Sequence, residues 1–383
     1  MSAGSLTNGS GLAKTGPKSR IARFAGAEIL PRRHYNTIEG LRGVGAALIV
    51  MRHAPELFGG FRVPESFLAV DLFYLVSGFV IAHAYGERLG EGGFAGRFMI
   101  TRLIRLYPLY LLGLAIGLVP AIIASVTDPD GWWNLPKVAE AVGTGLFMIP
   151  FFPGLGANGS SLDGPTWTLL PELIANLVFA VAIRFMNKRV LIATVLVCGT
   201  GVVLAEQLYG TLDVGFNPTD QWAALARVGF SFFLGVLMFR VGDGVEHRSE
   251  WIAWVAMALL AVALAFRPAA WFQGSYQLAL VLVGFPAMVW VAGRFEPSAI
   301  SGRVFAFIGL MSYGVYILHQ PLAVLARLGL DHFDVDAGDL IPWLTGPAFL
   351  AFLVILAWRL DKQYDAPVRN WLRDRLTPAR RTA

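Results

Sequence analysis

The segment YNTIEGLRGVGAALIVMRH, residues 35–53, is an apolar helical stretch that carries an arginine and a histidine. Arg42 and His53 are eleven residues apart. That spacing brings them within about 20° of each other around a helix and separates them by about 16 Å along its axis. A guanidinium inside hydrocarbon is costly and normally faces a bundle interior, a partner or a watery cavity. We therefore expect this stripe to line a site; the alternative is that both side chains extend to the two membrane interfaces.

The composition indicates a membrane protein. Of the 383 residues, 56% are hydrophobic and 15% are charged, which is typical of a polytopic helical protein in a lipid bilayer. The net charge of +5 could suggest nucleic acid as a partner, but the basic residues concentrate between apolar segments and report topology instead. Cys198 is the single cysteine, so an internal disulfide is excluded.

The apolar segments predict an all-α bundle with about ten transmembrane helices. Basic residues follow every second segment, which places both termini in the cytoplasm. We expect a disordered cytoplasmic tail over 1–34, a transmembrane domain over 35–376 and a short cytoplasmic tail over 377–383. The ten expected spans are 37–54, 67–85, 103–126, 166–186, 190–208, 222–240, 251–267, 276–293, 303–326 and 342–359.

The segment 137–153 does not fit this alternation. It is apolar but short, it is interrupted by Gly143, Gly145 and Pro150, and a full crossing there would invert every later loop. We expect it to be re-entrant or interfacial, packed against protein. An eleventh span is the alternative.

Three arginines are expected to meet near the cytoplasmic side. Arg42 lies near the inner end of the first helix, and Arg102 and Arg105 open the third in TRLIRLYPLY. Unpaired N–H groups and the macrodipole at a helix N-terminus already favour an anion. A ligand with phosphate groups is the interpretation we favour; arginines that only anchor the topology are the alternative.

Acid-base residues are expected nearer the outer side. His53, Asp71, Glu172 and His319 fall at similar depth in the expected topology. An imidazole next to a carboxylate can take a proton from a hydroxyl and hold the resulting imidazolium. Each has an alternative: Asp71 as a helix cap, Glu172 as the partner of an arginine, and His319 as a satisfied buried histidine.

Motifs for nucleotide hydrolysis and metalloprotease chemistry are absent from a suitable context in the sequence. We expect no metal site and no bound cofactor.

Five patches in order resemble acyltransferase family 3. They are IEGLRGVGAALIVMRH, VDLFYLVSGFVI, TRLIRLYPLY, PTWTLLPELIANLVF and SYGVYILHQP, and the likeness extends from about residue 35 to residue 376. Tyr74 stands where the family often has phenylalanine and Thr168 where it often has serine. The resemblance implies a membrane protein of about ten spans that transfers acyl groups, commonly acetyl from acetyl-CoA, to carbohydrates and other acceptors.

The resemblance also implies roles for individual residues. His53 would be the catalytic base, and Arg42, Arg102 and Arg105 would handle the acyl-CoA donor. Glu172 matches an acidic family position, and with Asp71 it is a candidate to orient His53. Further candidate substrate-binding residues within these patches are His319, Trp167, Ser77 and Tyr313. Trp167 could stack on a sugar, although anchoring at the interface is the commoner role.

The expected reaction is O-acylation of a carbohydrate hydroxyl in a bacterial inner membrane. Direct transfer and an acyl-histidine intermediate both remain open. An exopolysaccharide or lipopolysaccharide precursor is the expected acceptor, because no soluble domain follows the last span in this sequence. The alternative function is a carrier of a small organic anion or a lipid-linked sugar. The sequence predicts no particular oligomeric state.

Overall fold

The computed structural model describes residues 33–92, 94–128, 130–150, 162–242, 244, 246–336 and 339–377. The chain divides into residues 1–34 and a unit that begins at Tyr35. The expected tails, 1–34 and 377–383, lie almost entirely outside the described residues, so their predicted disorder stays a prediction.

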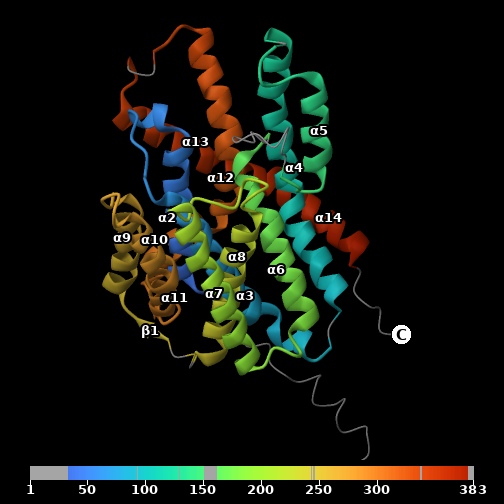
Figure 1. Cartoon of the computed structure of the whole chain (residues 1–383), viewed down its shortest axis with the longest axis vertical. Helices are drawn as coiled ribbons and strands as arrows, with labels where there is room; N and C mark the ends of the chain where they lie inside the picture. Colours follow the sequence, from blue (N-terminus) through green and yellow to red (C-terminus); the bar gives the residue numbers. More distant parts are fainter. Residues whose placement is uncertain are drawn as a thin grey trace, which may run out of the picture. The chain divides into compact units, whose positions relative to one another are not determined.

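The unit from Tyr35 is a bundle of helices, and the expected fold class is confirmed (Figure 1). Within the described ranges, eight helical segments are long and apolar enough to cross a membrane. They are α3 (Ala69–Gly90) with the turn before it, α4 (Ala95–Thr127), α6 (Leu169–Ala182) with the turn before it, α7 (Lys188–Tyr209), α8 (Gln221–Val241), α10 (Gln273–Ala279) continued by α11 (Phe285–Ala292), α12 (Ala299–His332), and α13 (Pro342–Leu360) continued by α14 (Ala366–Leu376).

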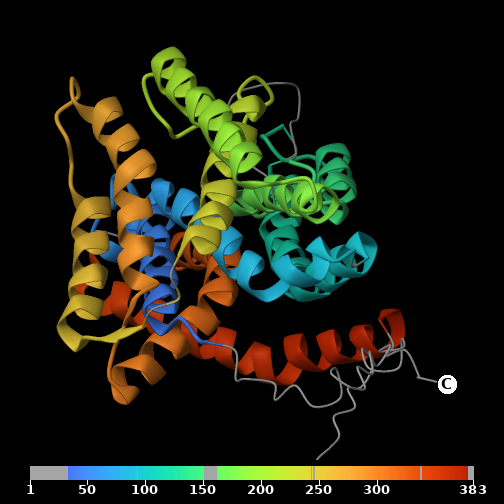
Figure 2. The ribbon, with the colours of Figure 1, turned by 90° about the horizontal axis from the view of Figure 1, so that it is seen from below.

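The other two expected spans are the shorter helices α2 (Asn36–His53) and α9 (Glu250–Ala265). Although α2 carries charged side chains, Ile38, Leu41 and Val50 on its other faces are fully buried in the core. It lies inside the bundle and packs against α12, α9 and α3 (Figure 2). The organising role expected of this segment follows from that position.

The irregular segment after α4 is a short helix, α5 (Leu135–Leu146). Twelve residues span about 18 Å, which is too short for the roughly 30 Å hydrocarbon core. Val138 and Ala141 pack on Leu114 and Ala121 of α4, and the two helices lie side by side (Figure 1). The structure therefore favours a short helix packed against protein over an eleventh span; residues 151–153 of the expected segment lie outside the described residues.

Helices α3 and α8 touch backbone to backbone. A Cβ added to Gly78 would collide with the carbonyl oxygen of Phe232, and one added to Gly235 would collide with that of Leu75. Only glycine permits this approach at the two positions. The contact fixes α3, which supplies one wall of the cavity described below.

The start of α2 is held by the only strand pair in the described residues, β1 (His247–Arg248) parallel to β2 (Phe295–Glu296). Glu296 Oε2 accepts a 3.0 Å hydrogen bond from the backbone N–H of Asn36, and the Thr37 hydroxyl donates to the carbonyl of Phe295. These bonds satisfy groups at a helix terminus that has no other side-chain cap.

Candidate active site

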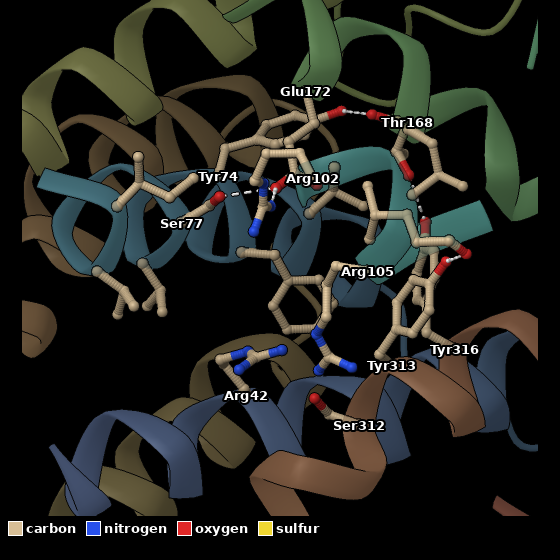
Figure 3. Close-up of a pocket in the computed structure, with 17 residues that line it drawn as sticks. Arg42, Tyr74, Ser77, Arg102, Arg105, Thr168, Glu172, Ser312, Tyr313 and Tyr316 are labelled. Atoms are coloured by element: carbon tan, nitrogen blue, oxygen red, sulfur yellow. Dashed lines mark hydrogen bonds and ion pairs between the residues drawn. The ribbon is translucent and has the colours of Figure 1, made fainter. Parts of the chain in front are cut away.

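A cavity of about 240 Å³ lies between α2, α3, α4, α6 and α12 (Figure 3). Its walls are apolar except for a small set of charged and hydroxyl groups. The lining residues are Arg42, Val70, Phe73, Tyr74, Val76, Ser77, Val80, Ile81, Arg102, Arg105, Leu106, Thr168, Leu169, Glu172, Ser312, Tyr313 and Tyr316. A mostly apolar cavity with a few convergent polar groups is typical of a ligand site.

The three arginines predicted to meet do line this one cavity, from α2 and α4. Arg42 is bonded to Glu39 one turn earlier at 2.9 Å, and both side chains stay between a quarter and a third exposed. Arg105 lies 4.0 Å from Asp365 and 5.8 Å from the ring centroid of Tyr313. The lining holds three guanidinium groups and one carboxylate, so its net charge favours an anionic ligand.

Glu172 also belongs to this cavity. Its Oε1 accepts a 2.7 Å hydrogen bond from the Ser77 hydroxyl and a 3.1 Å hydrogen bond from Arg102 (Figure 3). The expectation that Glu172 pairs with His53 therefore needs correction, because its described partners are Ser77 and Arg102. The error came from ranking residues by depth alone, which ignores the long reach of an arginine side chain.

Hydroxyl groups that bond to one another form part of the cavity wall. The Tyr316 hydroxyl donates to the carbonyl of Pro165 at 2.7 Å and lies 2.9 Å from the Thr168 hydroxyl. Tyr74 donates to the carbonyl of Thr168 at 3.1 Å, and the Phe73 ring meets Tyr316 edge to face. Tyr316 thus joins α12 to the turn before α6.

The two predicted histidines meet next to Tyr316. His319 Nε2 lies 3.0 Å from His53 Nδ1, and the Tyr316 and His319 ring centroids are 5.9 Å apart. His319 is fully buried. Neither histidine lines the arginine cavity within the described residues. The structure therefore brings His53 and His319 together and keeps both apart from the arginines.

The hydrogen bonds assign tautomers to this pair. His319 Nδ1 lies 2.7 Å from the carbonyl oxygen of Tyr316, and a carbonyl only accepts, so Nδ1 carries the proton. Neutral His319 then accepts at Nε2, and His53 donates from Nδ1, which also lies 3.2 Å from the carbonyl of Ile49. His53 Nε2 is left unprotonated, with no hydrogen-bond partner among the described side chains. A nitrogen in this state can act as a general base.

Asp71 is engaged elsewhere, which corrects the expectation that it orients His53. Arg227 forms two hydrogen bonds to the Asp71 carboxylate, at 2.6 and 3.1 Å, and a third to the carbonyl of Val214. Both side chains of the pair are about 1% exposed. Trp167 is not in the arginine cavity either; its ring centroid lies 5.9 Å from the Arg227 guanidinium.

Sequence reasoning missed Arg227 and Tyr316. The signal for Arg227 was present, because an arginine in the middle of the apolar segment 222–240 requires a buried partner. Tyr316 had no such signal, since a tyrosine in an apolar helix is ordinary.

Within the described ranges, no group of three or more His, Cys, Asp or Glu side chains is arranged to hold a metal ion.

Comparisons with known proteins agree with the resemblance seen in the sequence. A family model described as an acyltransferase domain matches residues 35–361. Protein 2 of the picA locus of Rhizobium radiobacter is 41% identical over 45% of this chain and 94% of its own length. A protein of Komagataeibacter xylinus named as a membrane-bound transacylase, BcsY, is 24% identical over 89% of this chain and 87% of its own. A Bacillus subtilis protein named as a peptidoglycan O-acetyltransferase, YrhL, is 20% identical over 77% of this chain and 49% of its own. No solved structure matches the chain.

The matched range begins one residue before α2 and ends one residue after α13, so it takes in the arginine cavity and the histidine pair. The family match favours an enzyme over the carrier that the sequence left as an alternative. The chain belongs to the acyltransferase family 3, and it is a multi-pass membrane acyltransferase.

Proposed function

We propose that this protein takes an acyl group, in particular acetyl, from acyl-CoA and transfers it to a hydroxyl of a carbohydrate in a bacterial inner membrane. The observation that carries the proposal is the spacing on α2. An anion-binding cavity around Arg42 is separated by about 16 Å along the helix from a histidine with an unprotonated ring nitrogen.

The donor would use both ends of this arrangement. The phosphates of acyl-CoA would bind Arg42, Arg102 and Arg105 by charge-assisted hydrogen bonds. The long pantetheine arm would then run past Tyr316 and bring the thioester to the histidine pair. A ligand that is anionic at one end and reactive at the other, with an extended chain between, accounts for two sites that are not adjacent.

The direct transfer follows from the tautomers. His53 Nε2 accepts the proton of the acceptor hydroxyl while the hydroxyl oxygen attacks the carbonyl carbon of the thioester. The tetrahedral intermediate collapses, the C–S bond breaks, and the thiolate takes the proton from His53 to leave as CoA. His319 accepts the Nδ1–H of His53 throughout and so holds the ring in place. In the alternative with an acyl-histidine, Nε2 attacks the thioester carbonyl first and the C–S bond breaks to release the thiolate. The acceptor hydroxyl then attacks the acyl carbon, the bond from that carbon to Nε2 breaks, and the hydroxyl proton goes to the thiolate.

The membrane side is part of the proposal. Basic residues flank the ends of α2, α4, α7 and α12 that lie nearest the arginines, which supports a cytoplasmic donor entrance and cytoplasmic termini. The acceptor would reach the histidine pair from the outer side. An exopolysaccharide or lipopolysaccharide precursor fits this position, and the names of BcsY and YrhL agree with acyl transfer and with a carbohydrate acceptor.

The test is acceptor-dependent release of CoA. Purified protein would be incubated with [14C]acetyl-CoA and, in separate reactions, lipopolysaccharide, muropeptides or cellopentaose, and label in the carbohydrate would be counted. We expect labelling by the wild type and a loss of about 10²–10⁴-fold in His53→Ala, the usual contribution of a general base. The exposed His332→Ala on α12 is the matched control and should behave as wild type. Equal labelling by His53→Ala, or release of CoA without any labelled product, would refute the proposal.

A further inference from the structure

A second, smaller cavity of about 40 Å³ lies between α4, α5 and the turn before α6. Its wall combines one carboxylate with aromatic rings and small apolar groups. The lining residues are Tyr110, Leu114, Ala141, Gly145, Met148, Ile149, Pro150, Leu162, Asp163, Gly164, Thr166, Trp167 and Phe216. This volume holds about three water-sized groups, enough for the hydroxyl-bearing edge of a larger molecule.

Asp163 supplies the carboxylate. It is 1% exposed, and neither of its side-chain oxygens has a hydrogen-bond partner in the described part of the chain. Burial raises the pKa of this carboxyl, which lies just before the membrane span of α6, well above its usual value. Leaving a buried acceptor unpaired is costly, so such groups usually mark a ligand, a water or a function.

A second unsatisfied acceptor lies beside it. The side-chain oxygen of Gln320 is also buried without a partner in the described ranges. The Gln320 amide packs directly on Gly164, where it leaves no room for a Cβ. Gln320 follows His319 in α12, so its contact with Gly164 connects this cavity to the histidine pair.

Aromatic rings complete the wall. The centroids of Trp167 and Phe216 lie 6.3 Å apart, and both rings line the cavity. Apolar aromatic faces next to unsatisfied acceptors suit a molecule with C–H groups on one face and O–H groups at its edge. A sugar ring has this character, and its hydroxyls can donate hydrogen bonds to Asp163.

We propose that this cavity is the acceptor subsite, where hydroxyls of a neutral, polyhydroxylated sugar donate to Asp163 and Gln320 while Trp167 and Phe216 contact the ring. The inference rests on the proposed function, because it assigns the place from which the acceptor hydroxyl reaches His53. The sugar should carry no acidic group at this edge, because a second carboxyl or phosphate next to the buried Asp163 would weaken binding.

Binding can be measured without any reaction. The protein would be purified in lauryldimethylamine oxide, a detergent without sugar, and mixed with methyl glucoside, methyl galactoside, methyl mannoside, N-acetylglucosamine and cellobiose. Saturation-transfer NMR would then detect bound sugar. We expect transfer to at least one sugar with the wild type, and about tenfold weaker binding with Asp163→Asn, as for the loss of one buried hydrogen bond. Phe216→Leu should weaken the same signal. Asp331→Asn, an exposed aspartate on α12, is the matched control.

CoA binding in the same samples separates folding from recognition. Asp163→Asn and Phe216→Leu should bind CoA as the wild type does, because neither residue lines the arginine cavity. If Asp163→Asn binds neither sugar nor CoA, that variant is misfolded and the test rests on Phe216→Leu, which should bind CoA normally and sugar more weakly. If no saturation-transfer signal reaches any sugar with the wild type, or if the signal is equal in all variants, water alone fills the cavity and the inference is overturned. Failure of the proposed function would appear differently, as absent CoA binding or absent acetyl transfer with sugar binding intact.

Discussion

His319 Nε2 accepts a hydrogen bond from His53 Nδ1 at 3.0 Å, and this contact joins the last residue of α2 to the interior of α12 across 266 positions in sequence. His319 itself is tied to the carbonyl of Tyr316. The position and protonation of the proposed base are therefore set by a second imidazole, where a carboxylate was expected.

Replacing His319 should separate positioning from chemistry. His319→Leu removes the acceptor for His53 Nδ1–H, so the His53 ring can turn or change tautomer, and we expect kcat to fall by about 10²-fold with little change in the KM for acetyl-CoA. His319→Gln retains an acceptor oxygen and should recover part of the rate. Steady-state kinetics of both variants provide the measurement. Equal losses in kcat for the two would speak against a positioning role and for a purely structural one.

The arginine cavity predicts weaker donor binding in Arg105→Ala. Loss of a charge-assisted hydrogen bond to phosphate costs about 1.5–3 kcal/mol, so the Kd for CoA should rise about 10- to 100-fold, while the melting temperature in detergent stays close to that of the wild type. Isothermal titration with CoA gives the Kd. Arg327→Ala, which removes an exposed ion pair with Glu56, is the control and should bind CoA normally. An unchanged Kd in Arg105→Ala would contradict the assignment.

Substitutions in the Asp71–Arg227 pair should lower the free energy of unfolding and should not remove a catalytic group. Removing one partner leaves an uncompensated buried charge, so Asp71→Leu and Arg227→Met should each destabilise the protein by about 3–5 kcal/mol, and the double variant should recover most of it. Thermal unfolding in detergent measures the effect. Restored activity in the double variant would assign Asp71 a structural role; a stable but inactive double variant would return Asp71 to the list of catalytic candidates.

Asp163 predicts a pH-dependent stability. Burial raises its folded-state pKa above the unfolded value of 3.8, so the folded protein binds a proton more tightly than the unfolded chain. The stability difference between Asp163→Asn and the wild type should therefore be largest above the folded pKa and should shrink as the pH falls through it toward the unfolded value. The titratable side chains nearest this carboxyl include Tyr110, Tyr313 and Tyr316, and a phenol carries no charge over the pH range of the measurement.

Melting temperatures of the two proteins between pH 5 and 9 test this, with Asp331→Asn as the control for general pH effects. We expect Asp163→Asn to be the more stable protein at pH 8. A difference that is constant across the range would mean that the carboxyl does not titrate differently in the folded state.

The sequence predicted the helical bundle and the cluster of arginines because both depend on patterns that one chain carries locally. Hydrophobic length marks a span, and the spacing of Arg42 and His53 places them on one stripe. The partners of Glu172 and Asp71 could not be predicted in this way. They depend on how far Arg102 and Arg227 reach from other helices, and periodicity along one helix holds no information on that distance. For His53 and His319 the sequence predicted only a similar depth in the membrane, not a direct contact. Their tautomers could be assigned only from the position of the Tyr316 carbonyl in the structure.

The hydrogen-bonded Tyr316 in the wall of the arginine cavity has a consequence for the cell. A passage that carried a pantetheine arm across the bilayer and stayed open on both sides would conduct protons and dissipate the membrane potential. If the donor's arm runs past Tyr316 as proposed, the phenol, bonded to Thr168 and to the carbonyl of Pro165 and in contact with Phe73, would block that route while no donor is bound. Energy coupling in the host membrane would then depend on this phenol yielding only when a donor occupies the space behind it.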